Sequence, residues 1–151
     1  MSLSNAFYNH LLNPLMRGLL RSPLHGAMSG NIAILHFTGR KSGRALNTPL
    51  SYVRDGDTVL FLSSQNTSWW KNFRDGPAQV QVELARQQRE GTATLLEGDS
   101  EVLRDRVRQF LKALPRDAVV YGVKLGSDKR PVESSLASAA PNLVIVEVAL
   151  G

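Results

Sequence analysis

Cysteine is absent from the 151-residue sequence, and histidine occurs only three times. The lack of cysteine excludes disulfide bonds, thiol nucleophiles and thiolate metal ligands, and it is compatible with a cytoplasmic location. His10, His25 and His36 have no second histidine or carboxylate at metal-ligand spacing, so we expect no metal site. No serine or histidine lies in a hydrolase-like context, and the sequence therefore shows no acid–base pair or nucleophile of its own.

Long apolar segments are absent as well. No run reaches the roughly 18 apolar residues that a membrane-spanning helix needs. The N-terminus also lacks a charged start followed by an apolar core and a small-residue cleavage site, so export is not expected. These features predict a cytoplasmic protein of one domain, residues 1–151, with enough length for a modest core.

Positive charge is in excess, since 18 lysines and arginines stand against 13 aspartates and glutamates, giving a net charge of +5. Such an excess favours an anionic partner, whether nucleic acid, an anionic membrane or an anionic small molecule. The cations are scattered, however, and form no run of the length that nucleic-acid-binding tails show. We therefore expect no nucleic-acid partner.

One basic segment stands between two apolar runs, residues 32–37 and 46–54, that are predicted strands. The eleven residues after the first run contain two glycines, three cations and three hydroxyl groups. Glycines let the backbone bend with its N–H groups outward, and adjacent cations then make an anion site. Arg40 and Arg44 can each hold a phosphate or carboxylate with two parallel hydrogen bonds, whereas Lys41 acts as a point charge. The composition indicates either a loop for a phosphorylated or carboxylated ligand or a solvated basic hairpin loop.

This segment is not a nucleotide-triphosphate P-loop. That motif ends in Gly-Lys-Ser/Thr and opens a helix, whereas here Gly43 is followed by Arg44 and Ala45. The pair Thr48-Pro49 also indicates extended chain after the loop, because the residue before a proline avoids the helical region.

Five short blocks carry a resemblance to a known family. They are Thr38-Gly39-Arg40-Lys41-Ser42-Gly43, Thr48-Pro49-Leu50, the hairpin 52–57, Ser63-Ser64 and Trp69-Trp70-Lys71-Asn72-Phe73. In order and spacing they resemble the deazaflavin-dependent nitroreductase and quinone reductase family of split β-barrel proteins. The resemblance implies an α+β fold, a split β-barrel of the flavin-reductase and pyridoxamine-oxidase type with about six antiparallel strands. Flanking helices and an N-terminal amphipathic helix would complete it, with residues 31–150 forming the barrel and the flanking helices.

The same resemblance implies an oxidoreductase. Such an enzyme binds the reduced deazaflavin coenzyme F-420 and passes its hydride to a small-molecule acceptor that is quinone-like, a nitro compound or an enone. Hydride transfer suits a chain without an acid–base pair, because the cofactor carries the reactive centre. Residues 63–70 lack the glycine-rich turn and His-Pro of many family members, which leaves FMN as an alternative cofactor. A non-catalytic cofactor or lipid carrier of the same fold is a further alternative, and the resemblance also implies a homodimer.

The predicted cofactor site combines the basic loop with three other blocks. Phosphate and carboxylates are assigned to Arg40, Lys41, Ser42 and Arg44, within the turn that also contains Thr38, Gly39 and Gly43. Thr48, Pro49 and Leu50 are expected to flank the ring, and backbone N–H groups near Ser63 and Ser64 to meet its polar edge. Trp69 and Trp70 would diverge by about 100° on a short helix, so they form either an aromatic wall beside the ring or two core anchors. Tyr121 is the predicted catalytic residue, a phenol that polarises the acceptor, because family members place a tyrosine in this region.

Residues 1–22 have the apolar stripe of an amphipathic helix that Pro14 kinks or divides. One interpretation packs this helix on the barrel or on a dimer partner. The other lays it on the cytoplasmic face of a membrane, with Arg17 and Arg21 at the lipid headgroups.

The remaining pattern predicts the other elements. Asp55-Gly56 indicates a hairpin with a type I′ turn. Further strands are expected at 58–63, 80–84, 89–96 and 143–150, with helices at 68–74 and 133–139. Another helix should be capped at Gly98-Asp99 and end at Pro115, with Arg104, Arg106, Arg108 and Lys112 on a solvated face.

Overall fold

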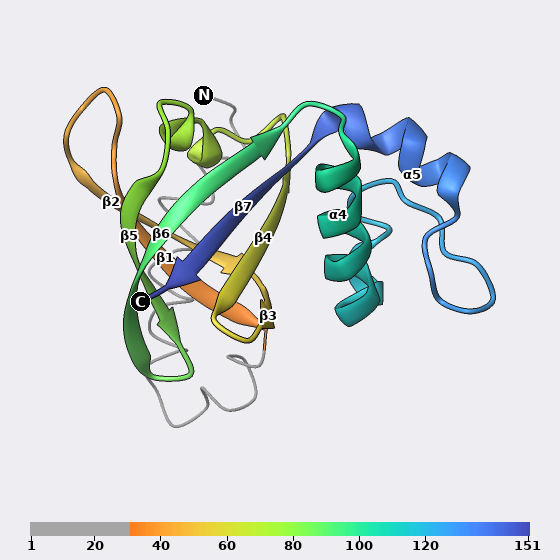
Figure 1. The fold of residues 1–151 in the computed structure, drawn as a ribbon, viewed down its shortest axis with the longest axis horizontal. Coiled ribbons are helices and arrows are strands. Elements are labelled where there is room, and N and C mark those ends of the chain that lie inside the picture. Colours follow the sequence, from red (N-terminus) through yellow and green to blue (C-terminus); the bar gives the residue numbers. More distant parts are fainter. Residues whose placement is uncertain (1–30) are drawn as a thin grey trace.

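A computed structural model describes residues 31–151, which form one curled antiparallel sheet with helices against one side (Figure 1). The predicted amphipathic helix of residues 1–22 and its predicted contacts lie outside the described residues. The strands are β1 (Ile32–Thr38), β2 (Ala45–Ser51), β3 (Val53–Asp55), β4 (Thr58–Ser64), β5 (Ala78–Leu84), β6 (Gln87–Glu97) and β7 (Leu143–Leu150). The helices are η2 (Trp69–Phe73), α4 (Glu101–Ala113), η3 (Pro115–Asp117), α5 (Glu133–Ala139) and η4 (Ala140–Asn142).

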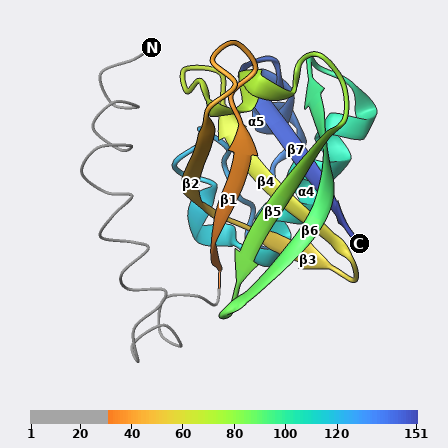
Figure 2. The same ribbon diagram turned by 90° about the vertical axis from the view of Figure 1, so that its left-hand side faces the viewer.

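The seven strands follow the order β2-β1-β5-β6-β7-β4-β3, and every neighbouring pair is antiparallel. In Figure 2 the sheet curls so that β1, β2 and β5 lie in front of β4 and β7. The predicted α+β split barrel is thereby confirmed. The sheet has one strand more than expected because the predicted strand 46–54 is interrupted at Tyr52, whose N–H donates to the Asn31 carbonyl at 2.9 Å.

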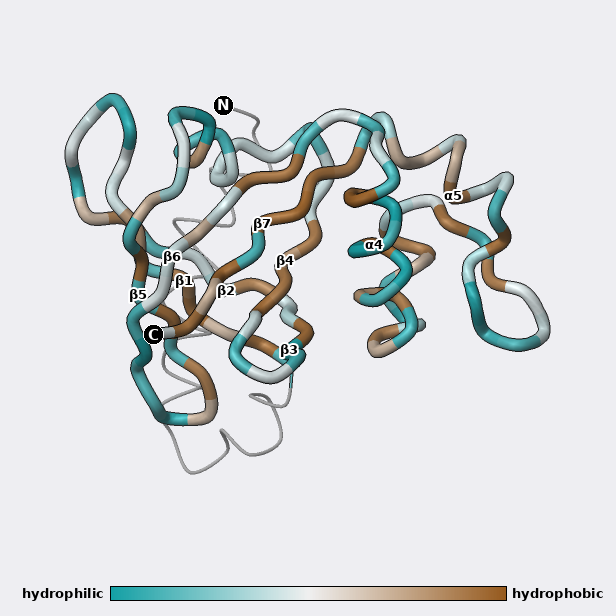
Figure 3. Tube along the Cα trace, in the orientation of Figure 1, coloured by the Kyte–Doolittle hydropathy of each residue, from teal (hydrophilic) through white to brown (hydrophobic). Residues whose placement is uncertain are grey.

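Two apolar clusters occupy the two faces of the sheet. The barrel core lies inside the curl and includes Phe61, Trp70 and Val146, while the helix core lies between the sheet and α4 and α5 and includes Leu62 and Phe110. Successive residues of β4 point alternately into the two cores, so this strand is apolar throughout. Figure 3 shows the resulting hydrophobic colour along β4 and β7.

The hairpin between β3 and β4 is confirmed, but its predicted type I′ turn is wrong. Asp55 pairs with Thr58, so the central residues are Gly56 and Asp57, and of these only Gly56 has a positive φ. A type I′ turn needs positive φ at both central residues. Two consecutive positive φ angles occur instead in the turn between β5 and β6, at Ala85 (44°) and Arg86 (71°).

The predicted helix after β6 is confirmed as α4, with two corrections. Its N-cap is Ser100, whose hydroxyl accepts from the Leu103 N–H at 3.1 Å, one residue beyond the predicted Gly98-Asp99. Its arginines are not simply solvated, since Arg104, Arg106 and Arg108 all form ion pairs. The predicted bounds of α5 and β7 match the structure.

Candidate functional site

The basic loop, residues 39–44, is a compact turn between β1 and β2. The Gly39 N–H donates to the Arg44 carbonyl at 2.8 Å, and the Gly43 N–H donates to the Gly39 carbonyl at 2.9 Å. A Cβ on residue 39 would lie 2.5 Å from Ser42 Oγ and 3.1 Å from Leu46 Cδ1, so a larger residue there would displace these two side chains. Gly43 has a φ of 68°, which also favours glycine. The two glycines therefore fix the turn that presents the cations.

The loop exposes more positive charge than its surroundings neutralise. Arg40 lies 3.5 Å from Asp75, whose side chain is 76% exposed. Among residues 31–151, Lys41 and Arg44 form no ion pair, and both are exposed. Unpaired cations on a turn of this kind attract a phosphate or a carboxylate.

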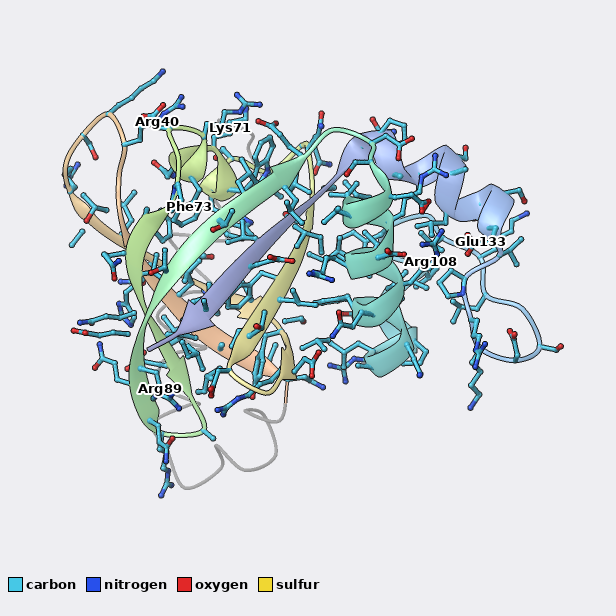
Figure 4. All side chains as sticks on the ribbon, viewed as in Figure 1. Arg40, Lys71, Phe73, Arg89, Arg108 and Glu133 are labelled. Atoms are coloured by element: carbon cyan, nitrogen blue, oxygen red, sulfur yellow. The ribbon has the colours of Figure 1, made fainter. Side chains whose placement is uncertain are left out.

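Helix η2 brings two further cations to this end of the sheet. Figure 4 shows Arg40 and Lys71 close together there. Lys71 Nζ lies 5.7 Å and the Arg74 guanidinium carbon 4.9 Å from the Trp70 ring centroid, which are cation–π distances. Arg74 also forms two hydrogen bonds with Glu97, at 2.9 and 3.0 Å, and these raise the pKa of Arg74 above its usual range. Lys71 and Arg74 were not among the predicted site residues. Their positions shortly after Trp69-Trp70 in the sequence could have indicated that they lie near the site.

A hydroxyl network holds the two tryptophans. Ser63 Oγ and Thr67 Oγ1 are 2.7 Å apart, and Trp70 Nε1 donates to Thr67 Oγ1 at 3.1 Å. Trp69 Nε1 donates to Ser63 Oγ at 3.3 Å. Both rings are buried in the barrel core. Ser68 is the N-cap residue of η2, and its side chain makes no capping hydrogen bond.

Ser64 is the last residue of β4 and is half-buried. Its hydroxyl donates to Asn66 Oδ1, and its carbonyl accepts from the Thr67 hydroxyl at 2.9 Å. The structure thus brings Ser63 and Ser64 together with the tryptophans through Thr67.

The predicted ring-flanking residues lie on both faces of β2. Thr48 pairs with Leu35 and Leu50 with Ala33, so these two face the barrel core, whereas Pro49 points to the opposite side. Thr48 is only 3% exposed. All three therefore cannot line the same side of one ligand ring.

Tyr121 lies away from the basic loop. It packs against the helix core, and its hydroxyl donates to the Leu62 carbonyl at 3.0 Å. The structure does not bring this phenol to the cations of the loop. Another tyrosine, Tyr52, packs against the barrel core, where burial raises the pKa of its hydroxyl and the nearby Arg54 partly opposes the increase.

A groove of about 550 Å³ adjoins the base of the loop. Thr38 and Ala45, the strand residues on either side of the loop, contribute to its wall, together with His36, Asn47, Gln79, Gln81 and Glu90. His36 Nε2 lies 3.1 Å from Glu83 Oε2. The groove offers hydrogen-bonding groups beside the positive charge, which suits an elongated ligand with an anionic part and a neutral polar part.

Two kinds of feature are absent from the described part of the chain. No helix within residues 31–151 is long and apolar enough to cross a membrane. The same residues contain no group of three or more His, Cys, Asp or Glu side chains that could hold a metal ion.

The curled sheet defines a split-barrel fold, and the loop between β1 and β2 exposes cations at one end of it. Residues 20–131 match the F420-H2-dependent quinone reductase family, and the chain therefore belongs to that family. It is an oxidoreductase that depends on the reduced deazaflavin coenzyme, as the resemblance predicted. No curated protein sequence matches the chain significantly.

Solved structures of similar fold support the split barrel. An F420-H2 dependent reductase (FDR-A) has a TM-score of 0.54 and 18% identity, covering 79% of this chain and 94% of its own. A pyridoxamine 5'-phosphate oxidase homologue from Listeria innocua has a TM-score of 0.52 and 13% identity, covering 90% and 93%. A protein solved as a domain-swapped dimer has a TM-score of 0.53 and 21% identity, covering 88% and 93%.

Proposed function

We propose that this protein reduces a quinone-like, nitro or enone acceptor and that the basic loop holds the anionic part of its deazaflavin coenzyme. The observation that carries the proposal is the pair of exposed cations, Lys41 and Arg44, that form no ion pair among residues 31–151. An oxidoreductase of this family needs an anion site, and these cations fit the coenzyme's phosphate and carboxylates.

The chain's own groups have distinct tasks in this proposal. Arg40, Lys41 and Arg44 bind the charged tail, and Ser42 Oγ, which accepts from the Arg44 N–H at 3.2 Å, keeps the turn in shape. When bound, the reduced coenzyme supplies the hydride. The barrel core beside Trp69 excludes water from the end of the sheet where the ring is proposed to lie.

The residues proposed to meet the ring are those bordering this end of the barrel core. They are Thr48, Leu50, Ser63, Ser64, Trp69 and Trp70, with Pro49 proposed to contact the ligand from the other face of β2. Tyr121 remains the proposed catalytic phenol, and in that role its hydroxyl would exchange the Leu62 carbonyl for an acceptor oxygen. Replacing Tyr121 with Phe should then lower kcat with each acceptor while leaving coenzyme affinity unchanged.

The test of the anion site is a fluorescence titration with the oxidised deazaflavin coenzyme and, in parallel, with FMN. Wild-type protein should bind the deazaflavin more tightly than FMN. The double variant Arg40→Ala, Lys41→Ala should bind it about 100-fold more weakly, because each charge-assisted hydrogen bond contributes about 1.5–3 kcal/mol.

The matched control removes the same amount of charge elsewhere. The double variant Arg104→Ala, Arg106→Ala lowers the net charge by the same two units, from +5 to +3, but on α4. Its coenzyme affinity should stay close to that of the wild type. A folded Arg40→Ala, Lys41→Ala variant with unchanged affinity would falsify the assignment of the loop.

We also propose a homodimer, because a protein of similar fold was solved as a domain-swapped dimer. Light scattering coupled to size-exclusion chromatography would then give twice the chain mass of 16.6 kDa. A monomer mass at micromolar concentration would contradict this proposal without affecting the anion site.

A further inference from the structure

One neutral side chain joins the basic loop to helix η2. The amide oxygen of Asn72 accepts a hydrogen bond from the Arg40 N–H at 2.9 Å. Its amide nitrogen donates to the Trp69 carbonyl at 2.9 Å. The two ends of this amide thus connect segments that are 32 residues apart in the sequence.

The loop has few other attachments to the rest of the protein. Within residues 31–151, its hydrogen bonds are internal to the turn except at Arg40, which contacts Asn72 through its backbone and Asp75 through its side chain. The contact with Asp75 is long, at 3.5 Å, and Asp75 is largely exposed. The Asn72 amide is therefore the principal polar anchor of the loop.

An aromatic contact supports the same docking from below. Phe37, in β1 just before the loop, lies 5.5 Å from Phe73 between ring centroids. Figure 4 places Phe73 beneath Arg40 and Lys71 at this end of the sheet. With the aromatic pair fixing η2 against β1, the amide of Asn72 sets the position of the loop backbone over the helix.

This anchor holds like charges close together. Figure 4 shows Arg40 of the loop close to Lys71 of η2, and the repulsion between these two cations opposes the docking. A carboxylate at position 72 could also accept from the Arg40 N–H, but it would neutralise part of the site. A neutral amide fixes the backbone and leaves the positive charge available to a ligand.

We propose that Asn72 is a positioning residue of the anion site, holding the loop cations beside Lys71 before the coenzyme arrives. This inference rests on the proposed function of the loop. Because preorganised charges bind an anion without a further ordering cost, loss of the anchor should weaken binding without removing any charge.

Two substitutions separate the anchor from the charge. Asn72→Ala removes the acceptor, so the Arg40 N–H should exchange with solvent faster by hydrogen-exchange NMR, and coenzyme affinity should fall about tenfold. Asn72→Asp keeps the acceptor, so the Arg40 N–H should stay protected while the added negative charge still weakens binding. Salt should shrink the affinity ratio between wild type and Asn72→Asp, because it screens the added charge, and should leave the ratio for Asn72→Ala unchanged.

Gln109→Ala is the matched control. It removes another side-chain amide that connects distant segments, since Gln109 Nε2 donates to Asp55 Oδ2 at 2.9 Å. This variant should lose a similar amount of thermal stability as Asn72→Ala and keep wild-type coenzyme affinity. A purely structural role for Asn72 would make the two variants behave alike in binding.

A double-mutant cycle completes the test. If Asn72 acts through the loop, Asn72→Ala should cost clearly less affinity in a Lys41→Ala background than in the wild type. Additive effects, or wild-type affinity and unchanged Arg40 exchange in Asn72→Ala, would overturn the inference. Should Asn72→Ala not fold, loss of Arg40 protection in the folded Asn72→Asp variant would overturn it equally.

The two proposals fail in different ways. If Arg40→Ala, Lys41→Ala binds the coenzyme as the wild type does, the loop is not the anion site and both proposals fall. If that variant loses affinity while Asn72→Ala keeps it, the anion site stands and only the role of Asn72 is lost.

Discussion

The basic loop and the surface of α4 carry arginines in opposite electrostatic situations. On the loop, Arg40 has one long contact with an exposed carboxylate, and Lys41 and Arg44 form no ion pair within residues 31–151. The loop also turns at Gly43, whose φ of 68° favours glycine, and all three cations of the loop are exposed.

On α4 every arginine has an acidic partner. Arg104 forms two hydrogen bonds of 2.7 Å with Asp99, and Arg106 pairs with Glu147. Arg108 bonds to Glu133 at 2.6 and 3.1 Å, as Figure 4 shows for these two labelled side chains. These pairs join α4 to the residue before its N-cap, to β7 and to α5.

The difference shows that arginine content alone does not locate a binding site. An arginine that is already hydrogen-bonded to an Asp or Glu side chain holds two elements together. A ligand anion could bind it only by displacing that carboxylate. Unpaired cations on a glycine turn lack that competition. Three experiments test this difference between the loop and α4.

The largest effect should come from reversing charge in each region. Arg44→Glu should weaken binding of the oxidised deazaflavin coenzyme by at least about 100-fold, because a favourable charge becomes a repulsive one. Its melting temperature should change little, since Arg44 holds no other element. Arg104→Glu should do the reverse, lowering the melting temperature while leaving affinity nearly unchanged. Equal affinity losses in both variants would mean that overall charge, and not the loop, governs binding.

A smaller effect should appear when the paired region is titrated. Hydrogen bonds from Arg104 and Arg108 lower the pKa values of Asp99 and Glu133 below their usual 3.8 and 4.5. A lowered folded-state pKa contributes stability that is complete above the unfolded value and is lost as the pH falls through the folded value. Stability should therefore decline below about pH 4.5.

Urea unfolding of the wild type and of Glu133→Gln between pH 6 and pH 2.5, a range chosen to span the usual carboxyl values, would measure this decline. Glu133→Gln should be less stable than the wild type at the upper end, and the two should converge at the lower end. Parallel curves over the whole range would show that the ion pair with Arg108 has no net effect on folding.

The smallest effect should come from removing the carboxylate of Asp75, which pairs with Arg40 of the loop. Asp75→Asn frees Arg40 from its 3.5 Å contact, so coenzyme binding should become about two- to fivefold tighter. The corresponding change on α4, Glu101→Gln, removes an exposed partner of Arg108 and should leave affinity as it is. Weaker binding in Asp75→Asn would indicate that Asp75 orients Arg40 for the ligand.

The local elements were largely predictable from the sequence. The β-branched run of β7 and the short helix α5 were predicted with their observed bounds. The bounds of such elements depend on residues that are close in the sequence, and the periodicity of apolar residues reveals them.

Contacts between distant segments were not predictable in the same way. The bond from Arg40 to Asn72 and the pairing of Arg108 with Glu133 depend on how the chain folds back, and no local pattern encodes them. The turn between β5 and β6 shows a further limit, because Ala85 and Arg86 adopt positive φ without the usual Asn-Gly or Asp-Gly signature.

Strand β7 has a consequence for how this protein is made. It pairs with β6 on one side and β4 on the other, and it follows all the other strands in the chain. Until residues 143–150 have been synthesised, β4 and β6 each present an unpaired backbone edge, which is a template for intermolecular association. The nascent chain thus keeps two open strand edges until β7 is translated, and slow translation of that segment would lengthen the time for which it needs protection from aggregation.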